Sequence, residues 1–157
     1  MNENTKTAFI EAVREHRSSM YRTAWAILRR SADAEDAVSC AVEATWRHLE
    51  QLKNLDALKA YLMRCTVNAA KRELYRRRRV SSMEETDETV AEPERASPIE
   101  EMIASLGEKY RLPLLLKFSE GYNESEIAVI LHLPRGTVSS RISRALKMLR
   151  DEFEREA

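Results

Sequence analysis

The stretch that decides the fold runs from Asn123 to Arg150 and reads NESEIAVILHLPRGTVSSRISRALKMLR. Asn123 is followed three residues later by Glu126, a capping-box pattern that predicts the start of a short helix. Pro134 and Gly136 then predict a turn that ends this helix and redirects the chain. A second helix is expected from about Thr137 to Glu152, so the segment predicts a helix-turn-helix.

A helical wheel divides the second helix into an apolar and a polar side. The apolar side carries Val138, Ile142, Ala145, Leu146 and Leu149. The opposite side and its flanks carry hydroxyl and basic residues: Thr137, Ser139, Ser140, Arg141, Ser143, Arg144 and Lys147. Arg135, in the preceding turn, belongs to the same predicted DNA-binding set. Hydroxyls bind phosphates or base edges, and arginine binds guanine through two hydrogen bonds, so the polar side predicts duplex DNA binding. A helical hairpin with a solvated face is the alternative interpretation.

The composition of the 157 residues favours an all-α class, since only three glycines and four prolines occur. The 26 basic and 26 acidic residues cancel, but they are segregated along the chain. Basic residues dominate from Arg64 to Arg79, and acidic residues dominate from Glu84 to Glu101. The zero net charge therefore does not exclude a nucleic-acid partner.

Helical periodicity organises the first half of the chain. It predicts one long helix or two in succession from Ala8 to Arg30, a further helix from about Asp33, and another from about Asp56 into the arginine cluster. Periodicity is lost from Val80 to Pro98, which holds two prolines and six acidic residues and predicts a flexible acidic linker. We expect two small helical domains, residues 1–79 and 99–157, joined by a linker at 80–98.

A strip of basic residues is expected along the helix that ends the first domain. It comprises Arg64, Lys71, Arg72 and the run Arg76 to Arg79, which together suit the phosphates of a nucleic acid. Tyr61 and Tyr75 are interleaved with the strip, and aromatic rings can stack on unpaired bases. Each tyrosine taken singly is expected in the core, as are Trp25 and Trp46. A solvated helix end is the alternative interpretation of the arginine run.

Several function classes lack the residues that they need. The three histidines are scattered, without a paired nucleophile, metal spacing or a glycine-rich phosphate loop, so neither an enzyme nor a metal, cofactor or small-molecule site is expected. Cys40 and Cys65 are isolated and are expected to be reduced thiols. No apolar run is long enough to insert into a membrane and the start MNENTKT is polar, so we expect a cytoplasmic protein.

Taken together, the two halves resemble the extracytoplasmic-function (ECF) group of bacterial RNA polymerase sigma factors. In the first half the resemblance lies in YRTAWAILRRSADAEDAVSCAVEATWRHL and AYLMRCTVNAAKRELYRRRR. In the second half it lies in SLGEKYRLPLLLKFSEGYNESEIAVILHLPRGTVSSRISRALKMLR, where GTVSSRISRA is the most specific string. Ser39, Val42 and Tyr61 depart from the residues usual in the group, which are Gln, Phe and Trp.

The resemblance implies a subunit that binds core RNA polymerase and promoter DNA and is controlled by an anti-sigma factor. It places in the polymerase-binding helix Ala34, Glu35, Asp36, Val38, Ser39, Val42 and Trp46. By the same resemblance, the melted strand of the minus-ten element would contact Asn68, Lys71 and Arg72. Other residues at or near this strand would be Tyr61 and Arg64, earlier on the helix, and Arg76 and Arg77, later on it. The helix-turn-helix would bind the minus-thirty-five duplex. The acidic linker would lie near the path of the RNA, and a solvated tether is the alternative interpretation of this segment.

Two other classes of protein remain open from the sequence. An autonomous transcriptional regulator would use the same helix-turn-helix without polymerase, and as a dimer it would match a palindromic site. A protein-interaction adaptor would use the first domain for docking and leave the basic strip as unused surface. Binding to core polymerase separates both from a sigma factor.

Overall fold

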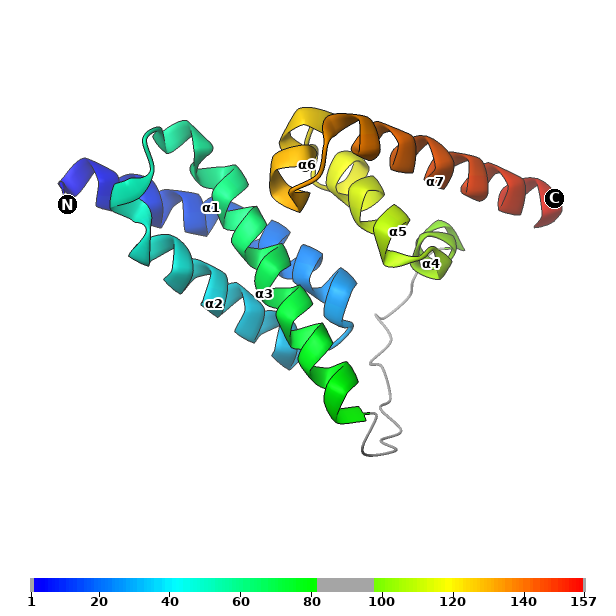
Figure 1. The fold of residues 1–157 in the computed structure, drawn as a ribbon, viewed down its shortest axis with the longest axis horizontal. Coiled ribbons are helices and arrows are strands. Elements are labelled where there is room, and N and C mark those ends of the chain that lie inside the picture. Colours follow the sequence, from blue (N-terminus) through cyan, green and yellow to red (C-terminus); the bar gives the residue numbers. More distant parts are fainter. Residues whose placement is uncertain (1, 82–97, 157) are drawn as a thin grey trace. The chain divides into compact units, whose positions relative to one another are not determined.

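The computed structural model describes residues 2–81 and 98–156, which fall into two compact helical units (Figure 1). Among these residues the secondary structure is helical throughout, without a strand, which confirms the predicted all-α class. We call residues 2–81 the N-terminal unit and residues 98–156 the C-terminal unit. The predicted acidic linker lies, apart from its first two residues and Pro98, outside the described residues.

The N-terminal unit consists of α1 (Glu3–Leu28), α2 (Ser31–Arg47) and α3 (Leu58–Ser81), with short 3-10 helices η1 (Leu49–Gln51) and η2 (Leu55–Ala57) between the last two. The first predicted helical stretch is thus one helix. It ends at Arg29, which adopts the left-handed conformation with φ of 59°. The Arg29 guanidinium lies 4.4 Å from the centre of the Trp25 ring and so covers the end of α1.

Small and medium apolar side chains from all three helices form the core of this unit. The largest contributions come from Met20, Leu28, Leu49, Leu62, Met63 and Val67. Each helix also buries one threonine, whose hydroxyl donates a 2.8 Å hydrogen bond to the carbonyl four residues earlier in its own helix: Thr23, Thr45 and Thr66. These hydroxyls therefore enter the core without an unsatisfied donor.

The C-terminal unit consists of α4 (Pro98–Ser105), α5 (Glu108–Leu114), the π-helical segment η3 (Leu115–Ser119), α6 (Glu124–Leu131) and α7 (Arg135–Glu156). The predicted capping box is confirmed, since Asn123 and Glu126 each accept a hydrogen bond from the other's backbone N–H. Gly121 adopts φ of 78°, as its place after the preceding helix predicts. Helices α5, α6 and α7 enclose a core of Leu112, Leu114, Leu116, Tyr122, Ile127, Ile130, Val138, Ile142 and Ala145.

The turn between α6 and α7 differs from the prediction at Gly136, which lies in the first turn of α7. His132 reverses the chain instead, in the left-handed conformation with φ of 55°. The Leu133 N–H then donates a 3.0 Å hydrogen bond to the Ala128 carbonyl, the closing bond of a Schellman motif. Histidine is among the residues that tolerate this conformation, so the turn does not need glycine.

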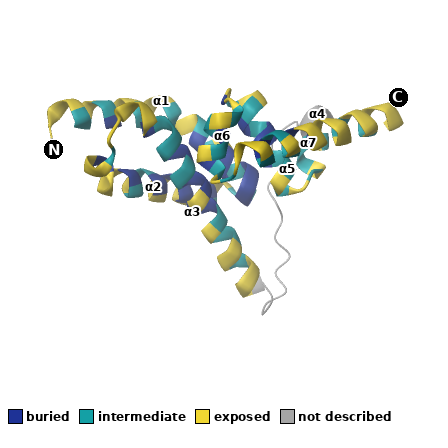
Figure 2. Ribbon diagram, turned by 45° about the horizontal axis from the view of Figure 1, so that its top comes forward, coloured by how far each residue is buried: buried dark blue, intermediate teal, exposed yellow. Residues whose placement is uncertain are grey.

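Three large residues expected in the core are exposed. Leu146 is 40% exposed, because it lies at the edge of the apolar stripe of α7. Trp46 is 42% exposed, since its ring packs against Phe9 on one side and leaves the other open. Tyr75 is 60% exposed on the last turns of α3, which Figure 2 colours largely as exposed.

Protonation of His16 on α1 should weaken the fold. Burial lowers the pKa of His16 and nearby Lys59 lowers it further, against the opposing effect of Glu15. The unfolded chain therefore binds a proton more readily, and stability should fall as the pH drops through the unfolded pKa of about 6.5 toward the lowered folded pKa. Urea unfolding at pH 5 and pH 7.5 should show a smaller pH-dependent loss for His16→Gln than for wild type; equal losses would contradict the prediction.

Candidate nucleic-acid and polymerase interfaces

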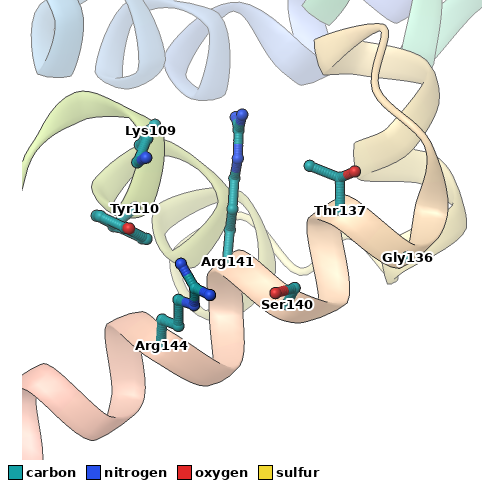
Figure 3. A pocket seen from close by; sticks show the side chains of 7 residues that line it. All are labelled: Lys109, Tyr110, Gly136, Thr137, Ser140, Arg141 and Arg144. Carbon is teal, nitrogen blue, oxygen red and sulfur yellow. The ribbon is translucent and has the colours of Figure 1, made fainter.

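The polar side of α7 forms an exposed basic surface on the C-terminal unit. We call Arg135, Ser140, Ser143, Arg144 and Lys147, all exposed, the recognition face. At one edge of this face, α5 and α7 enclose a depression of about 280 Å³ (Figure 3). Its lining consists of Lys109, Tyr110, Gly136, Thr137, Ser140, Arg141 and Arg144. Three cations and three hydroxyls in one depression provide donors for phosphates and base edges.

Ser139, at the other edge of the recognition face, makes a bond within the protein. Its hydroxyl donates to the carboxylate of Glu124 in the first turn of α6, and the Lys117 ammonium lies 3.4 Å from the same carboxylate. The Ser139 bond, followed by the Lys117 interaction, lowers the pKa of Glu124. Ser139 therefore links α6 to α7, a role that its place in the predicted DNA-binding set did not indicate.

Two residues of the depression, Lys109 and Tyr110, were not among the predicted site residues. The Arg144 guanidinium points toward Tyr110 in the depression (Figure 3), and its interaction with the phenol, together with nearby Lys109, lowers the pKa of Tyr110. The Lys109 ammonium lies 5.0 Å from the centre of the Tyr110 ring. In the sequence these residues are more than 30 positions from Arg144, and only the packing of α5 on α7 brings them together.

A second depression, of about 500 Å³, lies beside α3 in the N-terminal unit. It is lined by Ala44, Cys65, Asn68, Lys71 and Arg72, and we call it the Asn68 depression. Asn68 and Arg72 are exposed and Lys71 is half-buried, so three of the predicted strand-binding residues are brought together here.

Tyr61 and Arg64, the earlier members of the predicted strand-binding set, are both half-buried on α3. Neither lines the Asn68 depression. Burial raises the pKa of Tyr61, and neighbouring Cys65 raises it further. The tyrosine is therefore a neutral group that partly packs against its own unit.

The arginine run at the end of α3 does not form the uniform strip that was predicted. Arg76 is exposed and makes two hydrogen bonds, of 3.0 and 2.6 Å, to the Glu73 carboxylate. This bond lowers the pKa of Glu73. The side chain of Arg77 turns inward instead and is only 15% exposed.

Arg77 joins α3 to the corner between α1 and α2. Its Nη2 donates a 2.7 Å hydrogen bond to the Leu28 carbonyl at the end of α1. Its Nη1 lies 3.6 Å from Oδ2 of Asp33, in the first turn of α2. Burial lowers the pKa of Arg77. The expectation that Arg77 meets a nucleic acid is therefore corrected, because these contacts hold its guanidinium inside the unit.

A third depression, of about 320 Å³, lies between α1 and α2 and we call it the Trp46 depression. Its lining consists of Phe9, Arg17, Val38, Ser39, Val42, Glu43 and Trp46. Four of these belong to the predicted polymerase-binding set, whereas Phe9 and Arg17 on α1 and Glu43 on α2 were not anticipated. The Phe9 and Trp46 rings lie 5.2 Å apart, centre to centre.

The remaining members of the predicted polymerase-binding set divide between surface and core. Glu35 and Asp36 are exposed on α2. Ala34 is fully buried, so its assignment to a binding surface is corrected. It packs inside the unit because the apolar side of α2 faces α1 and α3 at that position.

Two further properties concern other kinds of site. Within residues 2–81 and 98–156, no group of three or more His, Cys, Asp or Glu side chains is arranged to hold a metal ion. Across the same ranges, none of the helices combines the length and apolar character that a membrane span requires.

Comparison with known proteins matches both halves of the chain. The Sigma-70 region 2 family matches residues 12–80 and the Sigma-70, region 4 family matches residues 97–149. RNA polymerase sigma factor SigV of Bacillus subtilis is 24% identical over 161 residues, covering 98% of this chain and 96% of that protein. The ECF RNA polymerase sigma-E factor of Escherichia coli K12 is 30% identical over 144 residues, covering 79% of this chain and 75% of that protein.

A solved structure supports the fold. The sigma factor RpoE from Bartonella quintana, solved in complex with the anti-sigma factor NepR, has a TM-score of 0.80 and 18% identity, covering 93% of this chain and 96% of that one. The two regional matches and the 30% identity to an ECF sigma factor show the family. The chain therefore belongs to the sigma-70 family of RNA polymerase sigma factors, within its extracytoplasmic-function group.

Proposed function

We propose that this protein binds core RNA polymerase in the cytoplasm and directs promoter recognition, DNA melting and transcription initiation, without catalysing a reaction itself. The observation that carries the proposal is that one sigma-70 chain presents two chemically different polar and basic surfaces, one on each of its two units. The Asn68 depression offers an amide beside cations, and the recognition face offers hydroxyls beside arginines. These surfaces suit an unpaired strand and a duplex, respectively.

The Asn68 depression is the proposed site for the melted strand of the minus-ten element. An exposed amide both donates and accepts hydrogen bonds, as does the Watson–Crick edge of an unpaired base. Lys71 and Arg72 in the same depression supply positive charge for the adjacent phosphates. Because a paired base hides its Watson–Crick edge, this site would act only after strand separation.

The recognition face is the proposed site for the minus-thirty-five element. It places Ser140, Ser143, Arg144 and Lys147 on the outer side of α7, while the opposite side is buried against α5 and α6. Such a helix fits a major groove, where arginine distinguishes guanine from the other bases.

The Trp46 depression is the proposed polymerase contact. It combines apolar side chains with Arg17, Ser39 and Glu43 at its edges, and a half-exposed tryptophan is a frequent anchor of protein interfaces. An anti-sigma factor that covered this surface would block polymerase binding, so we expect such a partner to inhibit the protein.

Replacing Asn68 by alanine should slow promoter opening while leaving the initial duplex complex intact. The loss of one amide contact to an unpaired base should reduce the rate of open-complex formation by about 5- to 10-fold. Permanganate footprinting measures strand opening, and a filter assay measures initial binding. A template with a premelted bubble should restore most of the transcription.

The matched control is Asn4→Ala, which removes an exposed amide on α1, far along the sequence from the depression. This variant should open promoters at the wild-type rate. A defect of Asn68→Ala that was equal in initial binding and in opening would contradict the assignment of Asn68 to the melted strand.

One binding experiment distinguishes a polymerase subunit from an autonomous transcriptional regulator. Purified protein is mixed with core RNA polymerase and passed over a size-exclusion column, and the protein alone is titrated onto duplex DNA. We expect co-elution with core enzyme and weak duplex binding alone. Failure to co-elute, together with tight dimeric binding to a palindromic duplex, would favour the regulator instead.

A further inference from the structure

Arg144 is one of two arginines on the recognition face, and its side chain is exposed on α7. A free arginine side chain samples many rotamers, and immobilising such a side chain in an interface costs roughly 0.5 to 1.5 kcal/mol. Any contact within the protein that already fixes Arg144 would reduce this cost before DNA binds. The depression between α5 and α7 places Tyr110 where it can make such a contact.

Tyr110 is well placed to fix Arg144. It comes from α5, it is half-buried, and it lines the same depression as Arg144 (Figure 3). Within the depression, the Arg144 guanidinium points toward Tyr110 (Figure 3). The Lys109 ammonium lies 5.0 Å from the centre of the Tyr110 ring, so the ring itself has a neighbour within the unit.

We propose that Tyr110 is a positioning residue for Arg144, holding its guanidinium at the groove-facing edge of α7 before DNA arrives. The inference rests on the proposed binding of duplex DNA by the recognition face. Arginine has five N–H donors, so a hydrogen bond from its guanidinium to the Tyr110 hydroxyl leaves enough donors to bind the O6 and N7 atoms of guanine. The Tyr110 hydroxyl proton also remains available for an acceptor such as a phosphate oxygen.

Placing Tyr110 in this role makes α5 part of promoter recognition, although it lies outside the helix-turn-helix. The hydroxyl acts through Arg144, so its effect should appear only at the base pair that Arg144 reads. A tyrosine that merely filled space would instead affect every promoter equally. Tyr110→Phe distinguishes positioning by the hydroxyl from space filling by the ring, because it removes the hydroxyl and keeps the ring.

The test is transcription by the full protein with core polymerase on promoters in which each minus-thirty-five base pair is substituted singly. Arg144→Ala should reduce discrimination at one base pair by about 5- to 150-fold. Tyr110→Phe should reduce discrimination at the same base pair by about 2- to 12-fold, the equivalent of the immobilisation cost. In the Arg144→Ala background, Tyr110→Phe should have no further effect.

The matched control is Tyr21→Phe, which removes a hydroxyl that makes a 3.0 Å hydrogen bond to Ser31 in the N-terminal unit. It should leave discrimination at every minus-thirty-five base pair unchanged. Tyr110→Phe overturns the proposal if it leaves discrimination unchanged, lowers transcription equally on all promoters, or adds to Arg144→Ala. If Arg144→Ala left discrimination unchanged at every minus-thirty-five base pair, that result would instead overturn the recognition face itself, and the role of Tyr110 with it.

Discussion

Replacing Arg77 by alanine should lower the free energy of unfolding of the protein by about 2 kcal/mol. The change removes the donor to the Leu28 carbonyl and leaves Asp33 without its partner from α3. Asp33 Oδ2 is already buried without a hydrogen bond. Removing the nearby positive charge of Arg77 therefore leaves the negative charge of the Asp33 carboxylate less well balanced. Urea unfolding followed by far-ultraviolet circular dichroism measures the effect.

Arg76→Ala is the matched control, since it removes the neighbouring guanidinium from the same helix. Its partner Glu73 is bound on the surface, where ion pairs contribute about 0 to 1 kcal/mol. Arg77→Lys should recover only part of the loss, because lysine keeps the charge but not the planar set of donors. Equal unfolding midpoints for Arg76→Ala and Arg77→Ala would contradict the role assigned to Arg77.

Replacing Trp46 by alanine should weaken binding to core RNA polymerase by about 30-fold or more, the effect of losing an interface anchor worth about 2 kcal/mol. The ring is 42% exposed and packs against Phe9, so it presents a fixed apolar surface to a partner. The dissociation constant can be measured by competition with a labelled wild-type protein.

Phe153→Ala is the control for Trp46→Ala, because Phe153 is also exposed, at 65%, but lies near the end of α7. It should bind core polymerase as tightly as the wild type does. Circular dichroism should show that both variants keep their helix content. An unchanged dissociation constant for Trp46→Ala would remove the Trp46 depression from the proposed polymerase interface.

The parts of the fold that could be predicted from the sequence are those in which a short local pattern determines the conformation. The capping box of Asn123 and Glu126 and the left-handed Gly121 are both confirmed, since each depends only on neighbouring residues. The predicted turn after α6 was wrong in detail, because His132 reverses the chain and Gly136 lies in the first turn of α7. The π-helical winding of η3 was also missed; it follows Pro113, which removes a backbone donor from α5.

The sites were harder to predict from the sequence, because they depend on which side of a helix faces the rest of its unit. Four consecutive arginines look alike in sequence, yet Arg77 points to the corner of α1 and α2 while Arg76 stays on the surface. Nothing in the sequence around Tyr110 indicates a link to Arg144, and only the packing of α5 against α7 places both residues in one depression. Local spacing carries no information about such partners.

The measurement that tests the central claim most directly is transcription from a random library of promoter fragments by core polymerase with and without this protein. Sequencing the 5′ ends of the transcripts shows where initiation occurs. We predict new start sites that share two separated sequence elements, with use of the upstream element reduced by Arg144→Ala and use of the downstream element reduced by Asn68→Ala. Identical start sites with and without the protein would contradict its assignment as a promoter-reading subunit of the polymerase.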